Sequence, residues 1–203
     1  DQKLTPYHED MKKAGACFGV TGGYERPMWY ATDGQKPEYE YSYNYQNWYP
    51  AVEYETKNTR ENVGLFDLTA FSKYDLKGKN VHFELQKLCT ANIKNKPGKT
   101  TYTQMLNKDG GIETDLTVIC FGKEHFRIVT SAANRERDKF HILKHLSKDI
   151  DFKDVTDNIA CFGIFGPKSI DLLQKLTKDN ISKNSINFAS FKECLLYTSP
   201  SPR

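Results

Sequence analysis

The sequence has no apolar run that approaches the roughly 18 residues of a membrane-spanning helix, and no charged-then-apolar leader opens it. It also has no block of about five or more basic residues. Lys plus Arg number 29 and Asp plus Glu number 26, which leaves a net charge of +3. We therefore expect no membrane association and no nucleic-acid binding by bulk electrostatic attraction.

Several common chemical motifs are also missing. The five cysteines, at positions 17, 89, 120, 161 and 194, form no C-x-x-C motif and no cluster with histidine. A zinc or redox motif is therefore not supported, and the scatter is typical of a reducing compartment. There is no G-x-S-x-G motif and no Walker loop. The Gly-rich residues 19–23 lack both the full G-x-G-x-x-G pattern and a preceding strand, so they give little support to a dinucleotide site.

The chain is instead rich in aromatic residues. Twelve Tyr, twelve Phe and two Trp make up 13% of its 203 residues. They offset a hydrophobic content of only 38%, because aromatic side chains bury the most area, so we expect a folded protein rather than disorder. The length suits one domain, or one domain and part of another.

The two ends of the sequence are unusual. The chain begins at Asp1 rather than Met, which is compatible with a fragment or a processed start. Residues 194–203 depart from the Lys/Asn-rich composition before them and carry no acid. We interpret them as a sequencing-adapter artefact, with a flexible Ser/Pro-rich tail as the alternative, and leave them out of the fold prediction.

Hydrophobic periodicity and turn residues predict an α+β fold. The clearest signal is a hairpin, in which residues 101–106 and 112–121 flank the turn residues 107–111. Further strands are predicted over 39–45, 72–76, 126–130 and 160–165, and helices over 6–14, 52–63, 80–90, 136–147 and 169–177. Sequential antiparallel strands mixed with helices argue against a doubly wound sheet.

The strand predicted over 39–45 has an aromatic face, because Tyr39, Tyr41, Tyr43 and Tyr45 alternate with polar residues. Such a face can stack a planar ligand or single-stranded nucleic acid, or it can pack against a neighbouring segment. No basic groove accompanies the rings, which favours packing.

The helix predicted over 136–147 places Phe140, Leu143 and Leu146 on or near one face. His141 and His145 lie one turn apart on it, a spacing that metals can use. No acid stands at metalloprotease spacing, so a solvated helix face is the favoured interpretation.

Asp115 is the acid of most interest, since it lies early in an otherwise apolar return strand, with Glu113 on the same face by alternation. A carboxylate there can accept a hydrogen bond from a ligand N–H and take its proton. The alternative is a solvent-facing acid at a hairpin end, and spacing alone favours that alternative.

Together these motifs resemble the tetrahydrofolate-binding domain shared by the glycine-cleavage T-protein (aminomethyltransferase) and the dimethylglycine/sarcosine dehydrogenases. The resemblance covers roughly residues 5–193, and the segment from Tyr102 to Leu116 is its most specific part. The matching segments are 5–7, 15–16, 64–69, 102–107, 110–116, 131–138 and 166–167. The resemblance implies an aminomethyltransferase-like α+β domain with mixed or antiparallel sheets and flanking helices, truncated at its C-terminal side.

Residues 23–30 and the Tyr-rich insertion at 32–50 resemble the dehydrogenase branch of this family. In that branch an FAD domain oxidises an N-methyl amine, and the folate domain captures the one-carbon unit as 5,10-methylenetetrahydrofolate. The resemblance thus implies a small-molecule substrate, tetrahydrofolate as a cofactor, and FAD in a domain upstream of Asp1. It also implies a mitochondrial matrix or bacterial cytoplasmic location.

The resemblance further implies a set of site residues. Asp115 matches the acid that hydrogen-bonds the N10 region of the folate and assists its attack. Tyr102 matches a folate-contacting aromatic, Phe71 an apolar folate contact, and Ser131 a position that is commonly Asn in T-proteins. No metal site is expected.

The expected organisation is a linker or insertion over residues 1–50, the N-terminal part of the folate domain over 51–193, and the artefact over 194–203. Three alternatives remain beside the dehydrogenase. They are a stand-alone aminomethyltransferase, a non-catalytic regulatory relative of the same fold, and a folate-dependent sulfonium demethylase. The retained Asp115 argues against the second and the Tyr-rich insertion against the third.

Overall fold

The structure is a computed structural model that describes residues 2–32 and 34–194, so nearly all of the suspected artefact lies outside the described residues. The chain divides into two compact units. One comprises Asp1–Ala70 with Ala160–Ser169, and the other comprises Phe71–Ile159 with Ile170–Arg203. Helices and antiparallel sheets occur together, which confirms the α+β prediction. The predicted domain boundaries stay a prediction.

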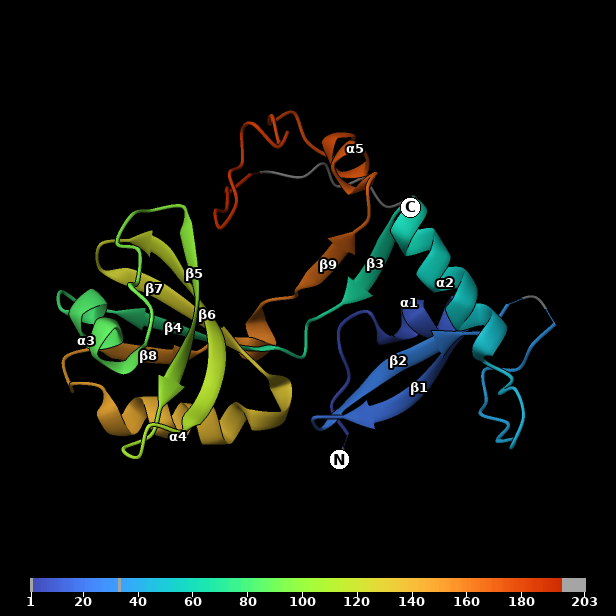
Figure 1. The fold of residues 1–203 in the computed structure, drawn as a ribbon, viewed down its shortest axis with the longest axis horizontal. Coiled ribbons are helices and arrows are strands. Elements are labelled where there is room, and N and C mark those ends of the chain that lie inside the picture. The colour runs from blue at the N-terminus through green and yellow to red at the C-terminus, as the bar shows by residue number, and fades with distance from the viewer. Residues whose placement is uncertain (1, 33, 195–203) are drawn as a thin grey trace, which may run out of the picture. The chain divides into compact units, whose positions relative to one another are not determined.

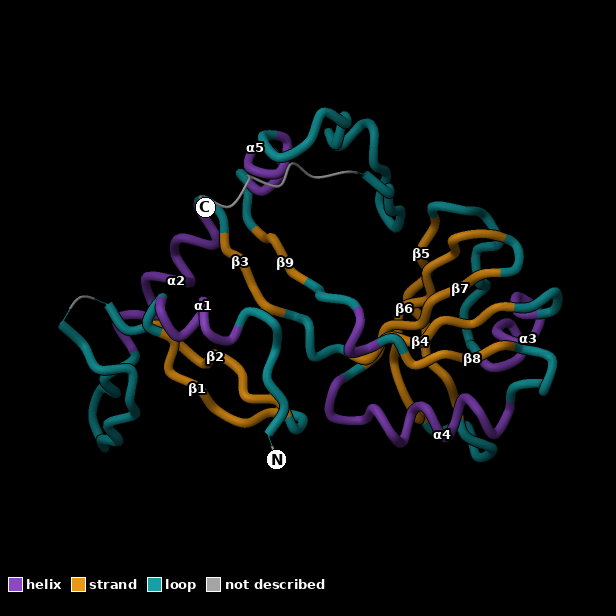
Figure 2. Tube along the Cα trace, turned by 180° about the vertical axis from the view of Figure 1, so that it is seen from behind, coloured by secondary structure: helices purple, strands orange, loops and turns teal. Residues whose placement is uncertain are grey.

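The second unit is built on a five-stranded antiparallel sheet with the strand order β5-β6-β7-β4-β8, which Figure 1 and Figure 2 show from opposite sides. Its strands are β4 (Ser72–Lys77), β5 (Lys99–Leu106), β6 (Ile112–Gly122), β7 (His125–Thr130) and β8 (Asp151–Asp154). Its two longer helices are α3 (Val81–Leu88) and α4 (Arg135–His145). All were predicted from the sequence except β8.

One face of this sheet forms the core. Alternate residues of β6, from Thr114 through Leu116 and Val118 to Cys120, are buried on it. Val81 and Leu85 of α3 and Ile142 of α4 belong to the same core cluster. Because both helices contribute to one cluster with these strands, they cover the same face. We call the opposite face, on which Tyr102 and Asp115 are exposed, the open face.

The β5–β6 hairpin confirms the strongest local prediction. Asn107 organises its turn, since its side-chain Oδ1 accepts hydrogen bonds from the backbone N–H groups of Asp109 and Gly111 at 3.0 and 2.9 Å. Gly110 has φ +82°, a conformation that glycine adopts without the penalty of a Cβ atom.

The apolar residues predicted to share a face of α4 are not its core residues. Phe140 is 69% exposed and Leu143 is also exposed, while Leu146 lies just beyond the helix and packs partly against the core. The buried positions are Asp138 and Ile142, one turn apart. The apolar pattern misled because an acid occupies a core-facing position.

The first unit begins with α1 (His8–Lys13) and a hairpin of β1 (Ala16–Thr21) and β2 (Tyr24–Tyr30), followed by α2 (Tyr49–Glu61). The sequence analysis missed this hairpin. Gly22 and Gly23, with φ +62° and +80°, form its tight turn, so the Gly-rich stretch is a hairpin turn and not a phosphate-binding loop.

The strand predicted over 39–45 was wrong. These residues are all described and form a loop before α2. The backbone N–H of Glu40 donates to Asn47 Oδ1 at 3.1 Å and that of Ser42 to Gln46 Oε1 at 3.0 Å, which takes the place of a partner strand. Tyr39 packs edge-on against Trp29 and Trp48 as the packing interpretation expects, whereas Tyr41, Tyr43 and Tyr45 are exposed.

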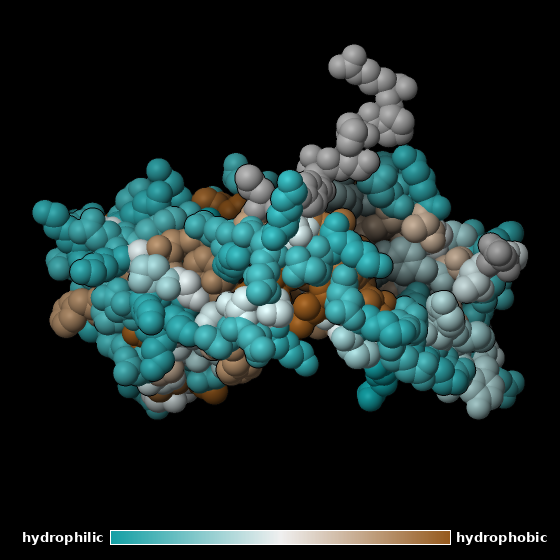
Figure 3. Space-filling view, turned by 90° about the horizontal axis from the view of Figure 1, so that it is seen from above, coloured by the Kyte–Doolittle hydropathy of each residue, from teal (hydrophilic) through white to brown (hydrophobic). Residues whose placement is uncertain are grey.

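Two further strands of the first unit pair with each other, β3 (Gly64–Asp67) and β9 (Phe162–Phe165). The helix α5 (Ser169–Gln174) follows β9. Leu65, Phe66, Phe162 and Phe165 of this ribbon are exposed. Figure 3 shows patches of hydrophobic surface on a mostly hydrophilic exterior. In residues 2–32 and 34–194, no helix has the length and apolar content needed to cross a membrane.

The α4 correction leads to a stability prediction. We expect Ile142→Ala to lower the free energy of unfolding by about 2–5 kcal/mol, because it leaves a cavity under the sheet. The exposed Phe140→Ala should change it by less than about 0.5 kcal/mol. Urea unfolding of both variants checks this, and similar losses would show that the buried face of α4 is assigned wrongly.

Candidate functional site

The β5–β6 hairpin brings Tyr102 and Asp115 together. The register pairs Tyr102 with Thr117 and Gln104 with Asp115, so Tyr102 is diagonal to Asp115 on one face. The Tyr102 hydroxyl donates a hydrogen bond to Asp115 Oδ2 at 2.9 Å. The contact is specific to this register, because a shift of one residue would send the two side chains to opposite faces.

Ser131 and Phe71 lie next to the ends of the two following strands, β7 and β4. Thr130 pairs with Leu116 on one side and with Ser72 on the other, and all three point into the core. Asp115 precedes Leu116 in β6 and so faces the opposite side of the sheet, the open face. Ser131 and Phe71 lie one residue beyond the ends of β7 and β4, and we infer that they continue this row across the sheet. The Ser72 hydroxyl donates to the Ser131 carbonyl at 3.3 Å, which ties this end of the row together.

We call these four residues, Phe71, Tyr102, Asp115 and Ser131, the open-face row. Asp115 is exposed, Tyr102 is 64% exposed and Phe71 is 37% exposed. In the described part of the chain, the two cavities detailed below are lined by other residues. At these residues the row is therefore exposed surface.

The charges on this face are unevenly compensated. Arg127 donates to both oxygens of Asp75 at 2.6 and 3.0 Å, and His125 lies 3.3 Å from one of them. Burial raises the pKa of Asp75, but the hydrogen bonds and charge of Arg127 outweigh it and leave that pKa lowered. Asp115 instead accepts a hydrogen bond from the Tyr102 hydroxyl, which is not a cation.

The pairing also affects Tyr102. The hydrogen bond to Asp115 raises the pKa of the Tyr102 phenol above its ordinary value, and a hydrogen bond with Gln104 acts in the opposite direction. The sequence analysis missed Gln104. Its signal is alternation, since Gln104 stands two residues after Tyr102 in the same strand and directly opposite Asp115.

The histidine pair of α4, His141 and His145, was the other candidate considered from the sequence. The rings of His141 and His145 lie 4.7 Å apart on α4, and His145 Nδ1 contacts the His141 carbonyl at 2.8 Å. Among residues 2–32 and 34–194, no group of three or more His, Cys, Asp or Glu residues could hold a metal ion.

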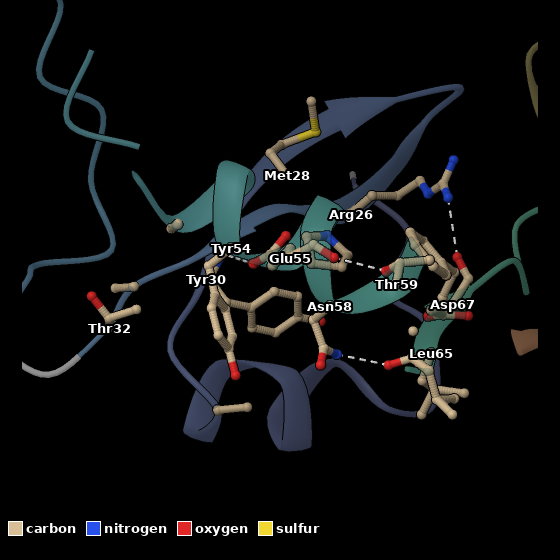
Figure 4. A pocket seen from close by; sticks show the side chains of 17 residues that line it. Arg26, Met28, Tyr30, Thr32, Tyr54, Glu55, Asn58, Thr59, Leu65 and Asp67 are labelled. Atoms are coloured by element: carbon tan, nitrogen blue, oxygen red, sulfur yellow. Dashed lines mark hydrogen bonds between the residues drawn. The ribbon is translucent and has the colours of Figure 1, made fainter. Parts of the chain in front are cut away.

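A cavity of about 490 Å³ lies within the first unit, lined by residues of β2, α2 and β3. Figure 4 shows Arg26 donating to the Asp67 carbonyl, at 3.0 Å, and the Tyr30 N–H donating to Glu55, at 3.2 Å. Burial raises the pKa of Glu55 and the Tyr30 hydrogen bond partly offsets this. Both charged side chains already bind backbone groups, so we consider this cavity a weaker candidate for a ligand site than the open-face row.

A second cavity, of about 320 Å³, is lined by Lys94, Lys96 and Lys99 together with Phe188 and Ala189. Lys99 donates to the Ser190 hydroxyl at 2.8 Å, which engages one of the three cations. It lies at the far end of β5 and adds nothing to the open-face row.

Comparison with known proteins settles the family. The model of the GCVT N-terminal domain matches residues 7–200. The chain belongs to the GCVT N-terminal domain family. The aminomethyltransferase-like domain expected from the sequence is thereby confirmed.

Curated relatives of this GCVT N-terminal domain fall into two groups. It is 37% identical over 182 residues to a 4-methylaminobutanoate oxidase (formaldehyde-forming) of Paenarthrobacter nicotinovorans, covering 89% of this chain and 22% of that protein. It is 30% identical to mitochondrial dimethylglycine dehydrogenase of Homo sapiens, covering 86% and 20%. It is 32% identical to an aminomethyltransferase of Synechocystis sp., covering 88% and 45%. The chain thus spans about a fifth of the first two and under half of the third.

Among solved structures, glycine cleavage system aminomethyltransferase T from Bartonella henselae matches with a TM-score of 0.69 and 23% identity, covering 86% of this chain and 44% of that one. This likeness confirms the expected fold. The roles of the open-face row stay predictions.

The Tyr102–Asp115 contact predicts a titration. We expect Asp115→Asn to lower the pKa of Tyr102 toward the ordinary phenol value of about 10, because the carboxylate that stabilises the protonated phenol is gone. Tyrosine ¹³Cζ NMR follows the titration, with Tyr102→Phe identifying the resonance. The control Asp109→Asn, an exposed acid of the same hairpin, should leave it in place; an unchanged pKa in Asp115→Asn would contradict the contact.

Glu55 predicts a pH-dependent stability. Its raised pKa means that folding favours the protonated form, so the ionised carboxyl costs stability above that pKa. We expect Glu55→Gln, which keeps an acceptor for the Tyr30 N–H, to stabilise the chain at pH 7 by at most about 1 kcal/mol. The gain should vanish below about pH 4, where glutamate is protonated in both folded and unfolded chains. Thermal unfolding at both pH values measures it, and a pH-independent effect would count against a desolvated Glu55.

Proposed function

We propose that this chain binds tetrahydrofolate on the open-face row, as part of an FAD- and folate-dependent enzyme that demethylates N-methyl amines. The observation that carries the proposal is the Asp115 carboxylate, exposed and paired only with a neutral hydroxyl among the described residues. The relatives support the enzyme class, since those named as an oxidase and a dehydrogenase of N-methylated substrates include the 37% identical protein.

The residues present suit a reduced pterin and its linker. Asp115 supplies an acceptor for an N–H group, Tyr102 and Phe71 supply partly exposed rings for a flat ligand, and Ser131 adds a hydroxyl at the end of the row. Bound tetrahydrofolate would supply nucleophilic nitrogens that take up a one-carbon unit.

The role of the protein follows from the row. Asp115 accepts the N–H hydrogen bond, orients that nitrogen and holds its proton at the carboxylate. Tyr102 holds the Asp115 side chain through Oδ2, and the other carboxylate oxygen, Oδ1, would accept the hydrogen bond of the ligand N–H. Phe71 and the Tyr102 ring reduce water contact around the nitrogen, which strengthens the hydrogen bond.

FAD does not fit the described residues. The Gly-rich stretch closes the β1–β2 hairpin, so it offers no strand–turn–helix phosphate site. We therefore place the flavin, and the small-molecule amine substrate, in another domain of the same polypeptide. The relatives named as an oxidase and a dehydrogenase are about five times as long as the matching region, which supports this arrangement. Relatives named as mitochondrial and relatives from bacteria support a mitochondrial matrix or bacterial cytoplasmic location.

A stand-alone aminomethyltransferase is the second candidate. The likeness to the Synechocystis sp. protein, of which the chain covers 45%, favours it. The gene upstream of Asp1 separates the two, because a strand–G-x-G-x-x-G–helix pattern there indicates the flavin enzyme.

Folate binding by the 203-residue chain tests the proposal. Isothermal titration with tetrahydrofolate under reducing conditions should show binding, and Asp115→Asn should weaken it by about 10- to 100-fold, the value of a hydrogen bond to a charged group.

The matched control is Asp109→Asn, which removes an exposed acid from the turn of the same hairpin and should leave the affinity unchanged. Wild-type affinity in a folded Asp115→Asn variant, or equal losses in both variants, would overturn the proposal.

A further inference from the structure

Asp138 is a buried acid beneath the open-face row. It lies in the first turn of α4 and is only 1% exposed. Its Oδ2 accepts hydrogen bonds from the hydroxyls of Thr114, at 2.9 Å, and Thr130, at 2.5 Å. These two hydroxyls also lie 3.1 Å from each other, so one carboxylate oxygen joins α4 to β6 and to β7.

The two threonines are the immediate neighbours of row residues. Thr114 precedes Asp115 and Thr130 precedes Ser131, and alternation sends each threonine to the core and each row residue to the open face. A side chain held on the core side therefore restrains the backbone that carries the row residue, since consecutive Cα atoms are only about 3.8 Å apart.

Arg137 adds a second connection from α4. It donates to the Glu113 carbonyl, and its Nε lies 3.5 Å from Asp138 Oδ1. Arg137 and Asp138 thus connect the first turn of α4 to two consecutive residues at the start of β6, Glu113 and Thr114.

Stability alone does not explain an acid at this position. A buried carboxylate loses its hydration, and a well-packed apolar side chain often serves a core equally well. The two hydroxyls and the positive end of the α4 dipole offset that loss at Oδ2. Oδ1 is buried without a hydrogen-bond partner among the described residues and has only the Arg137 Nε charge at 3.5 Å. Hydrogen bonds are directional, whereas apolar packing is not. Two of them to one oxygen therefore fix the positions of Thr114 and Thr130 relative to each other.

We propose that Asp138 is a positioning residue for Asp115: through Thr114 and Thr130 it sets the relative placement of β6 and β7, and so keeps the Asp115 carboxylate within reach of Tyr102 and of the ligand. The part of this inference that concerns the ligand rests on the proposed folate function. The part that concerns the Tyr102–Asp115 hydrogen bond does not. Asp138 touches neither the ligand nor the reacting atoms.

The decisive variant is Asp138→Asn, which keeps the shape but replaces one acceptor oxygen with a donor. At neutral pH the Tyr102 ¹³Cζ resonance should move toward its position in Asp115→Asn. Tetrahydrofolate affinity should fall by about three- to tenfold, the value of one misdirected hydrogen bond. In the Asp115→Asn background, Asp138→Asn should cause no further loss of affinity, because its effect passes through Asp115.

Two variants separate positioning from stability. Ile142→Val, one turn along α4 in the same core, should lower the melting temperature without moving the Tyr102 resonance or the affinity. Thr114→Val removes one hydroxyl of the network and should reproduce both effects of Asp138→Asn, and it replaces that variant if Asp138→Asn does not fold.

Two results would overturn the proposal. One is an unmoved Tyr102 resonance in folded Asp138→Asn, and the other is a loss of affinity in Asp138→Asn that adds fully to the loss in Asp115→Asn. If Asp115→Asn alone leaves folate affinity unchanged, the folate function fails instead, and the Tyr102 resonance still decides whether Asp138 positions Asp115.

Discussion

The register of β6 against β7 determines which side chains of the larger sheet reach the open face. Thr130 pairs with Leu116 on one side and with Ser72 on the other, so three neighbouring strands turn their core residues inward together. A slip of one residue would bury Asp115 and expose Leu116. The core on one face and the open-face row on the other therefore depend on the same set of backbone pairs.

Local chemistry was enough to predict the elements with strong signals. The Asp-Gly turn and the flanking alternation gave the β5–β6 hairpin, and apolar spacing gave α3. The hairpin of β1 and β2 was missed because its strand residues include glycine and proline, and β8 because it is short and charged. The tyrosine alternation over 39–45 predicted a strand that has no partner among the described residues, since side chains of the loop itself bind its backbone.

The candidate site shows a different limit. Spacing alone favoured a solvent-facing acid at Asp115 over a ligand contact, and only the family resemblance reversed this preference. The structure adds the hydrogen bond to Tyr102 and the shared row with Ser131 and Phe71, which depend on long-range pairing. The role of Asp138 could not be predicted from the sequence, because an acid in the charged first turn of α4 looks solvated until its threonine partners are known.

The hairpin origin of the Tyr102–Asp115 pair has a consequence for the folding pathway. The two residues are separated by a short loop, so closing it costs little chain entropy, whereas Phe71 and Ser131 are brought together across 60 residues, from 71 to 131. Contacts of low sequence separation form fastest, so we expect the acid and the phenol to meet before β4 docks. Newly made chain would then carry two of the four residues of the open-face row before the sheet that supports them is complete.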